Sequence, residues 1–588
     1  MIWRKQVLEE NNKAERRINI LLVGIICGFL FLLGRAAWLQ LWEGERYFRI
    51  SQDSRLQLIP LPPFRGLILD REGKILAENK VSFSVGVIPS NVKDINYLLN
   101  HLFEVLHLNK EIAIKKLQKI SNPFRPVCLK KDISASELTI LLEREDEFPG
   151  TIIIAHPMRF YPYKKLASHL IGHLGEVNSK ELSMNSFVNI EQGDFIGKMG
   201  IEKMYNKYLQ GKKGGRQIEV DAYGRSLRTI SEMDPLPGDN IYLTIDLNMQ
   251  KIAEEELGEY VGSVIIGDPY TGEIFALASH PAFDPNLFSG SILKEKWNEL
   301  KYNLNHPLQN RAIRGQYSPA STFKIIVTAA ALENKVVRKE DTLWCEGSLR
   351  IGNRIFKDWK AHGKVNLEKA IVQSCDVFFY QLGLKTGERQ IIRFARLFGL
   401  GESTGIDLLA ESQGLLPTPS WKLKNKGEKW WRGDTANLSI GQGYILVTPI
   451  QMFRAISAIA NGGRIVKPYL VKKIVDTKKR VIKESCNQEI RKIPLSPSTL
   501  HFLRKSLREV VTEGTGWKAE NKTVEISGKT GTVELSEGEN PHSWFIGYAP
   551  SKNPSLAIVV IIEHIKEKEE SASEVTGKIL SRIFKKQE

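Results

Sequence analysis

The chain has 588 residues, of which 42% are hydrophobic and 26% charged, a balance typical of a globular protein with two or more domains. Its formal net charge is +16, but lysines and arginines are mixed with acidic residues and form no aromatic-interleaved basic stripe, so we expect no nucleic-acid partner. The five cysteines are too widely spaced for a disulfide framework.

The N-terminal region predicts one transmembrane helix over residues 18–41. Residues 18–34 carry no charge, and the apolar character continues to Leu41 with only Arg35 and Gln40 as interruptions, which is long enough to span a bilayer. Basic residues are in excess over acidic ones before this segment, so the positive-inside rule places residues 1–17 in the cytoplasm as a tail. A cleaved signal peptide is the alternative, although Gly34-Arg35-Ala36 is a poor cleavage site.

The part outside the membrane divides near a proline-rich boundary. Residues 65–74 predict a strand and a turn, and residues 96–120 are largely helical in pattern. The segment Pro235-Leu236-Pro237-Gly238-Asp239 is the clearest linker signal. We therefore predict an extended mixed α/β pedestal over residues 42–239 and a second domain over residues 240–588.

The second domain has strand patterns at both of its ends and helical patterns between them. Residues 261–268 and 273–278 predict a hairpin, and residues 555–563 predict a very apolar strand before a helix at 572–584. This order predicts an α+β fold, whose antiparallel sheet is assembled from both ends of the domain.

Three short motifs lie in this second domain. In chain order they are Ser321-Thr322-Phe323-Lys324, Ser374-Cys375-Asp376 and Lys529-Thr530-Gly531. Ser-x-x-Lys and Lys-Thr-Gly are signatures of enzymes that form an acyl-serine, among them class A β-lactamases and penicillin-binding proteins.

Other copies of these patterns are separated from the motifs by their context. Two further Ser-x-x-Lys tetrads, at 90–93 and 291–294, lack the long apolar run that follows Ser321 over residues 321–332. A second Lys-Thr-Gly, at 385–387, ends a helical pattern, where its glycine is a plausible C-cap. We therefore assign the chemistry to Ser321, Lys324 and the Lys529 motif.

The spacing of the first motif predicts a serine nucleophile beside a lysine base. Ser321 and Lys324 are three residues apart on one helix face, and a lysine held beside a hydroxyl in a water-poor site loses proton affinity. The N-terminal end of the helix adds partial positive charge near a developing oxyanion. Residues 524–535 predict a strand with small central residues, Gly531 among them, which suits an edge where a peptide adds itself.

Potential metal ligands crowd between the first two motifs. Asp341, Asp358, His362 and Cys375 offer the oxygen, nitrogen and sulfur atoms that zinc takes, with Cys345 as an alternative ligand. No Cys-x-x-Cys pair is present, so ordinary packing and hydrogen-bonding roles stay open beside a structural zinc.

With these motifs placed, the chain resembles the class B penicillin-binding proteins and, within that class, the penicillin-binding protein 2 group of elongation-type D,D-transpeptidases. The resemblance covers nearly the whole length and also rests on segments at residues 65–71, 159–162, 276–286, 439–444 and 544–550. It implies one membrane anchor, a pedestal of the dimerisation type, and a penicillin-binding transpeptidase domain similar to serine β-lactamases.

The resemblance also implies roles for the motif residues. Ser321 would attack the D-Ala-D-Ala carbonyl of a peptidoglycan stem, Lys324 would be the base, and Ser374 would relay the proton to the leaving amine. Lys529 and Thr530 would hold the substrate carboxylate beside Gly531, and the backbone N–H groups of Ser321 and Thr532 would form the oxyanion hole. β-Lactams would acylate the same serine.

One residue departs from the usual family pattern. The second motif most often ends in Asn, whereas this chain has Asp376, which is ionised and only accepts hydrogen bonds. The acidic form is known in the penicillin-binding protein 2 group, and a salt bridge to a lysine is the structural role that we expect. The chemistry itself requires no cofactor, and a zinc ion would be structural.

The resemblance further implies an inner-membrane enzyme with its catalytic domain outside the cytoplasm. Its partners would be peptidoglycan stem peptides, lipid-linked glycan strands, a SEDS-family glycosyltransferase and other membrane proteins of cell elongation. Three alternatives stay open on the sequence: a cell-division transpeptidase, a D,D-carboxypeptidase or β-lactamase of the same fold, and a non-catalytic penicillin sensor or scaffold that activates a membrane polymerase.

Overall fold

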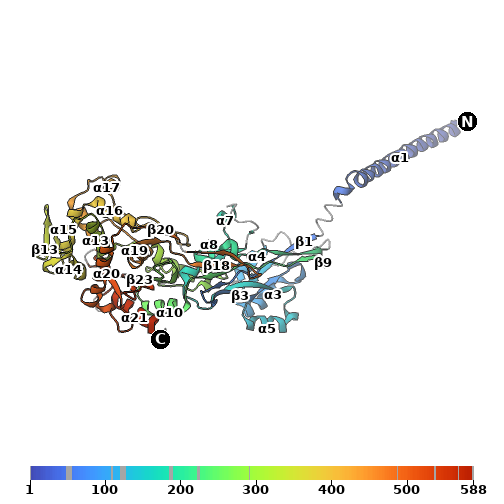
Figure 1. The fold of residues 1–588 in the computed structure, drawn as a ribbon. Coiled ribbons are helices and arrows are strands. Elements are labelled where there is room, and N and C mark those ends of the chain that lie inside the picture. The colour runs from blue at the N-terminus through green and yellow to red at the C-terminus, as the bar shows by residue number, and fades with distance from the viewer. Residues whose placement is uncertain are drawn as a thin grey trace. The chain divides into compact units, whose positions relative to one another are not determined.

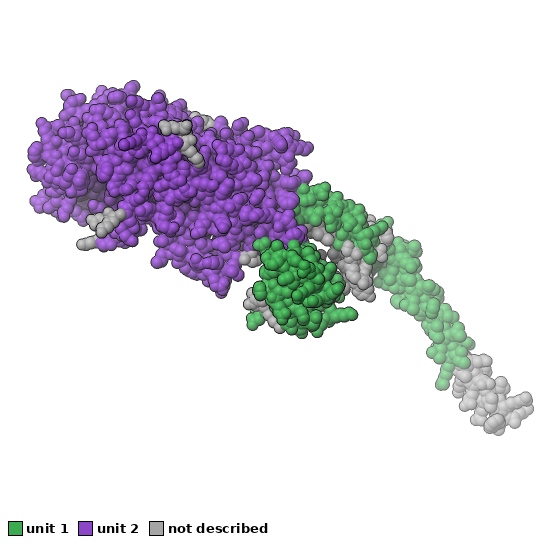
Figure 2. Space-filling view, turned by 90° about the horizontal axis from the view of Figure 1, so that it is seen from below, with its two compact units in different colours: residues 1–62, 84–154, 213–235 green, residues 63–83, 155–212, 236–588 purple. Residues whose placement is uncertain are grey.

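The computed structural model describes residues 2–47, 56–107, 110–118, 127–183, 190–191, 193–220, 226–290, 292–486, 488–535, 538–566 and 569–585. They form two compact units, coloured separately in Figure 2. Unit 1 comprises residues 1–62, 84–154 and 213–235, and unit 2 comprises residues 63–83, 155–212 and 236–588.

Unit 1 begins with a long helix, α1 (Ile2–Leu41), which carries the N-terminus in Figure 1. Within the described residues, Arg16–Leu41 is the only segment long and apolar enough to cross a membrane, and none of its side chains is buried. This segment contains the predicted anchor over residues 18–41. The same helix also includes most of the predicted tail, from residue 2 onward.

The rest of unit 1 is mixed α and β, as the sequence predicts. Three strands form an antiparallel sheet in the order β1 (Leu56–Leu61), β8 (Gly214–Val220) and β9 (Ser226–Met233). The helical pattern at residues 96–120 is divided into α3 (Ile95–Leu106) and α4 (Lys110–Gln118). This unit also contains β4 (Val127–Lys130), the end of β3 (Ile75–Val87) that pairs with it, α5 (Ala135–Glu143) and the start of β5 (Thr151–Phe160).

Five strands of a seven-stranded sheet and a buried ion-pair cluster hold the first segments of unit 2 together. Strands β2 (Ile68–Leu69) and β18 (Val471–Val475) flank β10 (Asn240–Leu243), while β3 (Ile75–Val87) pairs with β2 and β19 (Val481–Glu484) with β18. Glu202 is fully buried and accepts hydrogen bonds from Arg65 Nε at 2.6 Å and Arg159 Nε at 2.7 Å. Paired charges of this kind tolerate burial, so the cluster fixes three distant segments of chain in one place.

The main sheet of unit 2 is assembled from both ends of the domain, which confirms the predicted α+β fold. Its five antiparallel strands run in the order β12 (Ile274–His280), β11 (Gly262–Gly267), β23 (Leu556–Ile562), β22 (His542–Ala549) and β21 (Ser527–Val533). Alternate residues of β23 enter two different cores. One core is shared with α10 (Leu247–Leu257) and α21 (Ala572–Lys585), and the other with helices from the middle of the domain.

The middle of the domain is mostly helical (Figure 1). Its longer helices are α11 (Lys294–Tyr302), α13 (Lys324–Glu333), α15 (Asp376–Thr386), α16 (Glu388–Leu397), α17 (Pro419–Lys426), α18 (Arg432–Ser439), α19 (Pro449–Ala460) and α20 (Pro497–Thr512). Two hairpin-like pairs, β13 (Thr342–Cys345) with β16 (Gly363–Asn366) and β14 (Ser348–Ile351) with β15 (Arg354–Lys357), lie between α13 and α15 in sequence. A third pair joins β17 (Arg464–Val466) to β20 (Glu489–Lys492).

Candidate active site

Ser321 lies in a tight turn that leads into α13. The residue belongs to the 3₁₀ turn η4 (Ala320–Phe323), so the α-helix predicted to begin near it starts at Lys324 instead. The turn is fixed from two sides, because Ala320 N–H donates to Gly441 O at 2.9 Å and Trp544 Nε1 donates to Ser318 O at 3.1 Å. Ser321 itself is half-buried, which leaves its hydroxyl accessible at the start of an apolar helix.

Lys324 is fully buried and points to the second motif. Its Nζ donates to Ser374 O at 2.9 Å, to Ser374 Oγ at 3.2 Å and to Asp376 Oδ1 at 2.6 Å. The salt bridge expected for Asp376 is therefore present. The hydrogen bonds found among the described residues include none between Ser321 and Lys324, so Ser374 is the hydroxyl that the ammonium contacts directly.

The second motif is held in an unusual backbone conformation. Ser374 has a φ of 56°, in the left-handed region that a residue with a side chain rarely adopts. Immediately after it, Cys375 caps α15 by accepting the N–H of Phe378, and Asp376 occupies the first turn of that helix, where a negative charge is favourable. Strain of this kind persists only where the surroundings determine the conformation.

The third motif lies on the edge strand of the main sheet. Strand β21 pairs with β22 on one side only, so part of its backbone has no partner within the sheet. A Cβ atom at Gly531 would lie 3.1 Å from Pro319 O and 3.1 Å from Thr322 Cγ2, which shows that the strand packs directly against the Ser321 turn. Position 531 is occupied by glycine because this close packing leaves little room for a side chain.

Lys529 is the second buried lysine of the site. Burial lowers its pKa well below the usual range, and the nearby charge of Lys324 lowers it further, whereas Asp376 raises it. Its Nζ donates to Thr530 O at 3.1 Å. The structure thus brings the three motifs into one site that holds two lysines, two serines and one carboxylate.

The competing copies of the motifs lie elsewhere or have structural roles. Ser90 belongs to the turn η1 (Pro89–Asn91) of unit 1, and Ser291 is outside the described residues. Lys385 and Thr386 end α15, and Gly387, with a φ of 79°, is its C-cap as predicted.

Thr515 is a site residue that the sequence reasoning missed. Its hydroxyl lies 2.7 Å from that of Thr530, so it fixes the orientation of a side chain in the third motif. The glycines on both sides of it, in Gly514-Thr515-Gly516, are the signal that could have identified a close backbone approach.

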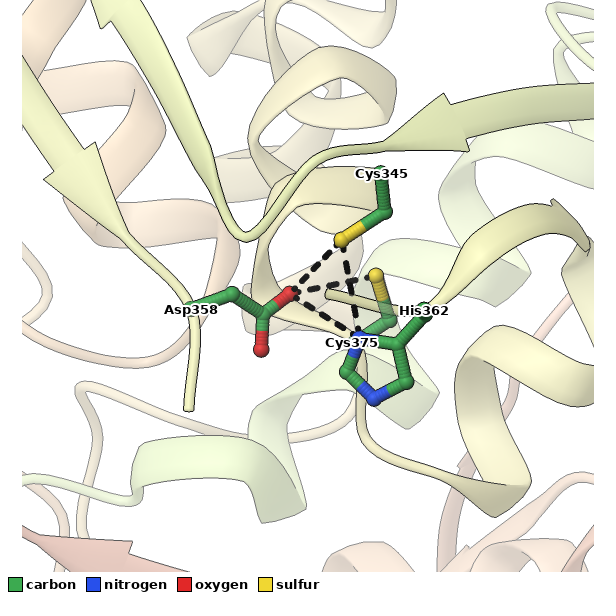
Figure 3. A group of neighbouring side chains, drawn as sticks. All are labelled: Cys345, Asp358, His362 and Cys375. Atoms are coloured by element: carbon green, nitrogen blue, oxygen red, sulfur yellow. Dashed lines mark hydrogen bonds and ion pairs between the residues drawn. The ribbon is translucent and has the colours of Figure 1, made fainter. Parts of the chain in front are cut away.

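Four potential metal ligands form a compact cluster directly behind the second motif (Figure 3). Cys345, Asp358, His362 and Cys375 turn their ligand atoms toward one another, and all of these atoms lie within 4.8 Å. Asp358 Oδ2 is 3.2 Å from Cys375 Sγ, 3.5 Å from Cys345 Sγ and 3.5 Å from His362 Nδ1.

The cluster corrects the predicted ligand set at one position. Asp341 is exposed and its carboxylate accepts the N–H of Arg338, so it does not contribute, and the alternative ligand Cys345 takes its place. The physical reason is the strand register, since β13 starts after Asp341 and pairs Cys345 with Gly363, the residue next to His362.

The spacing of the cluster fits a tetrahedral ion. Zinc bonds of roughly 2.0 to 2.3 Å place neighbouring ligand atoms roughly 3.3 to 3.8 Å apart, close to the distances between these side chains. Burial lowers the pKa of His362, which favours the neutral imidazole that binds metals. Burial also raises the pKa of the Cys375 thiol, so its proton would leave only in exchange for a cation.

Comparisons with known proteins agree with this geometry. The family described as penicillin binding protein transpeptidase domain matches residues 262–585, and the penicillin-binding protein dimerisation domain matches residues 60–243. The peptidoglycan D,D-transpeptidase MrdA of Acinetobacter baumannii is 33% identical, with 95% of this chain and 86% of that protein covered. The protein of the same name in Escherichia coli K12 is 30% identical, with 93% and 91% covered.

Solved structures are similar over most of the chain. Penicillin-binding protein PBP2 of Helicobacter pylori, in complex with MreC, has a TM-score of 0.78 and 29% identity, with 90% of this chain and 99% of that one covered. A chain from a peptidoglycan synthase complex described as coordinating polymerization and crosslinking has a TM-score of 0.72 and 29% identity, with 97% and 98% covered.

Proposed function

Because the chain belongs to the penicillin-binding protein transpeptidase family, we propose that Ser321 is the nucleophile with which it cross-links peptidoglycan. The chain is a peptidoglycan D,D-transpeptidase of the elongation type, similar to the MrdA proteins along nearly its whole length. The observation that best supports the residue assignment is the packing of Gly531 against the Ser321 turn, beside the Lys324, Ser374 and Asp376 network. This arrangement surrounds one accessible hydroxyl with two buried lysines and an open strand edge.

In the first step Ser321 Oγ attacks the carbonyl carbon of the penultimate D-Ala of a stem peptide. The bond between that carbon and the nitrogen of the terminal D-Ala breaks, and an ester to Ser321 forms. Lys324 acts as the base with its amine unprotonated: it takes the hydroxyl proton and passes it through Ser374, which hydrogen-bonds Lys324 Nζ, to the leaving amine. In the second step an amine of a neighbouring stem attacks the ester and displaces Ser321 Oγ, which recovers its proton.

The edge strand β21 and its buried lysine account for substrate binding. A donor peptide extends the sheet along β21 by main-chain hydrogen bonds. Its terminal carboxylate is held by Lys529 and by Thr530, whose hydroxyl Thr515 orients. An arriving carboxylate raises the proton affinity of Lys529, so substrate binding restores the charge that burial disfavours. The backbone N–H groups of Ser321 and Thr532 stabilise the oxyanion, each by about 3 kcal/mol.

We place the chain in the cytoplasmic membrane, with α1 as a single anchor, residues 1–17 inside and the catalytic domain outside. The excess of basic residues before Ile18 supports this orientation. A membrane glycosyltransferase of the SEDS family is the partner that we assign to it, and a protein such as MreC is a second. The support is the similarity to the chain of the peptidoglycan synthase complex and to the MreC-bound protein of Helicobacter pylori.

The cluster behind the second motif is proposed as a structural zinc site. Asp358 accepts the N–H of Val377 at 3.0 Å, and Cys375 stands between Ser374 and Asp376, so a bound ion would fix the strained backbone at Ser374. Elemental analysis should find about one zinc per chain, and Cys345→Ser should lose it. The exposed Cys486, changed to Ser, is the matched control. Protein without zinc at any stage of purification would refute the site.

Intact-mass measurement after incubation with penicillin tests the nucleophile. The wild-type chain should gain the mass of one penicillin, and Ser321→Ala should gain none. Ser318→Ala, in the same turn, is the control that should still be labelled, because Ser318 contributes a carbonyl to the fold and no group to the chemistry. Labelling of Ser321→Ala at the wild-type rate would eliminate the acyl-enzyme.

A further inference from the structure

Helix α16 presents a row of arginines away from the catalytic motifs. Arg389, Arg393 and Arg396 follow the spacing of successive helical turns and are exposed, whereas the opposite side of the helix is buried against α13 and α15. Among the described residues, none of the three forms an ion pair or a side-chain hydrogen bond.

This row does not stabilise the helix that carries it. Arg389 lies in the first turn, where a positive charge opposes the helix dipole, and like charges four residues apart repel each other. Glu402, the acid that lines the same hollow, is already shared by Arg491 Nη2 at 2.5 Å and Arg454 Nη2 at 3.3 Å. The arrangement therefore carries an excess of positive charge that helix stability does not explain.

The arginines line a hollow of about 530 Å³ between α16, the start of α17 and β20. Arg491 enters the hollow from β20 and also donates to the carbonyls of Arg396 and Leu397, so its guanidinium is fixed in place. Leu397 and Pro419 supply apolar wall. A volume of this size holds a ligand much larger than one small ion.

We propose that this hollow is a second binding site for a peptidoglycan strand, in which the arginines hold the free carboxylates of its stem peptides. The site rests on the proposed function and is separate from the catalytic motifs, since none of their residues lines the hollow. Guanidinium groups bind carboxylates through two parallel hydrogen bonds. The row extends over about 10 Å of helix, which matches several separate anionic groups better than one compact anion.

The consequence is that a strand stays attached while its stems enter and leave the cleft. An attachment outside the cleft raises the effective concentration of the next stem at Ser321. The site therefore favours successive cross-links on one strand.

Binding to penicillin-acylated protein isolates this site, because the cleft is then occupied. Soluble uncross-linked peptidoglycan strands should bind the acylated full chain, and the triple variant Arg389→Gln, Arg393→Gln, Arg396→Gln should bind at least about tenfold more weakly. The matched control removes three positive charges from another exposed helix: Lys294→Gln, Lys296→Gln, Lys301→Gln on α11 should stay within about twofold of wild type. Strands whose carboxylates have been amidated should bind as weakly as the triple arginine variant.

Acylation itself reports on folding and on the proposed function. The arginine variant should be acylated by penicillin at the wild-type rate, which shows that it folds. A wild-type chain that is never acylated would defeat the proposed function, and strand binding by the wild type and the arginine variant would then be compared without penicillin. Equal strand binding by the arginine variant and the wild type would overturn the proposal. So would tight binding of polyphosphate or phosphatidylglycerol vesicles in place of strands, since the ligand would then be a phosphate polyanion.

Discussion

The Lys324 to Asp376 ion pair offers a sharp test of the site, because Asp376→Asn removes one charge and keeps the shape of the side chain. The distance of 2.6 Å gives an attraction of about 6 kcal/mol at an effective dielectric constant of 20. This figure is a ceiling, because Asp376 is 24% exposed and water screens it, and because neutralising the carboxylate returns its own desolvation cost. A net loss of about 2 kcal/mol remains, as is typical of a hydrogen bond between charged groups.

Thermal unfolding and acylation kinetics measure the two consequences. Asp376→Asn should lower the melting temperature of unit 2 by roughly 2 °C, because a unit of this size unfolds with a large entropy. It should also slow acylation by penicillin about tenfold, because Lys324 loses the partner that orients it toward Ser374. Asp376→Ala should cost more in both assays, since it also removes the acceptor oxygen.

Asp434→Asn is the matched control, because Asp434 forms a similar pair with the buried Lys422 at 2.8 Å outside the site. It should lower stability and leave acylation unchanged. If Asp376→Asn melts and acylates as the wild type does, or if the control slows acylation equally, the role given to the ion pair is wrong.

Three further predictions address pH and the substrate site. Burial raises the pKa of Glu254 to about 7, so the folded state keeps this proton to higher pH than the unfolded state, and stability falls as the pH rises from about 4.5 to about 7. Glu254→Gln should therefore raise the free energy of unfolding above pH 7 by at most about 3 kcal/mol and leave it unchanged below pH 4.5, as measured by denaturant titration. Because burial lowers the pKa of Lys529, the rate of acylation by penicillin should fall as the pH rises, and the fall should begin well below pH 10.5. A penicillin methyl ester, which lacks the carboxylate, should show no such fall. Identical pH profiles for the two compounds would show that Lys529 does not bind the carboxylate. Thr515→Val should slow acylation several-fold, because the Thr530 hydroxyl loses its hydrogen-bond partner. Thr512→Val, on the exposed side of α20, is the control. An unchanged acylation rate in Thr515→Val would show that the Thr530 hydroxyl needs no such partner.

The sequence carried the parts of the fold that depend on local pattern. The hairpin at residues 261–278, the apolar strand at 555–563 and the terminal helix follow directly from periodicity and turn residues, and the structure confirms each of them. The three motifs were found because their residues are fixed relative to neighbours in sequence.

The parts that sequence reasoning missed depend on contacts between distant segments. The hydroxyl that Lys324 Nζ contacts directly is that of Ser374, fifty positions later, and the 3₁₀ turn at Ser321 depends on packing against Gly441 and Trp544. The choice between Asp341 and Cys345 as a ligand depends on the pairing of β13 with β16, since one residue of register decides which side chain faces His362. No local pattern determines these pairings.

The position of β23 in the centre of the main sheet sets the order in which the sheet can form during synthesis. Strands β11 and β12 are synthesised long before residues 556–562, yet β11 has no other neighbour on that side, and β21 and β22 join it only through β23. The part of the sheet that carries Lys529 therefore joins the rest only after this late segment has been synthesised. A chain still being synthesised has an unfinished sheet and an incomplete site, so cross-linking can begin only when synthesis of the domain is complete.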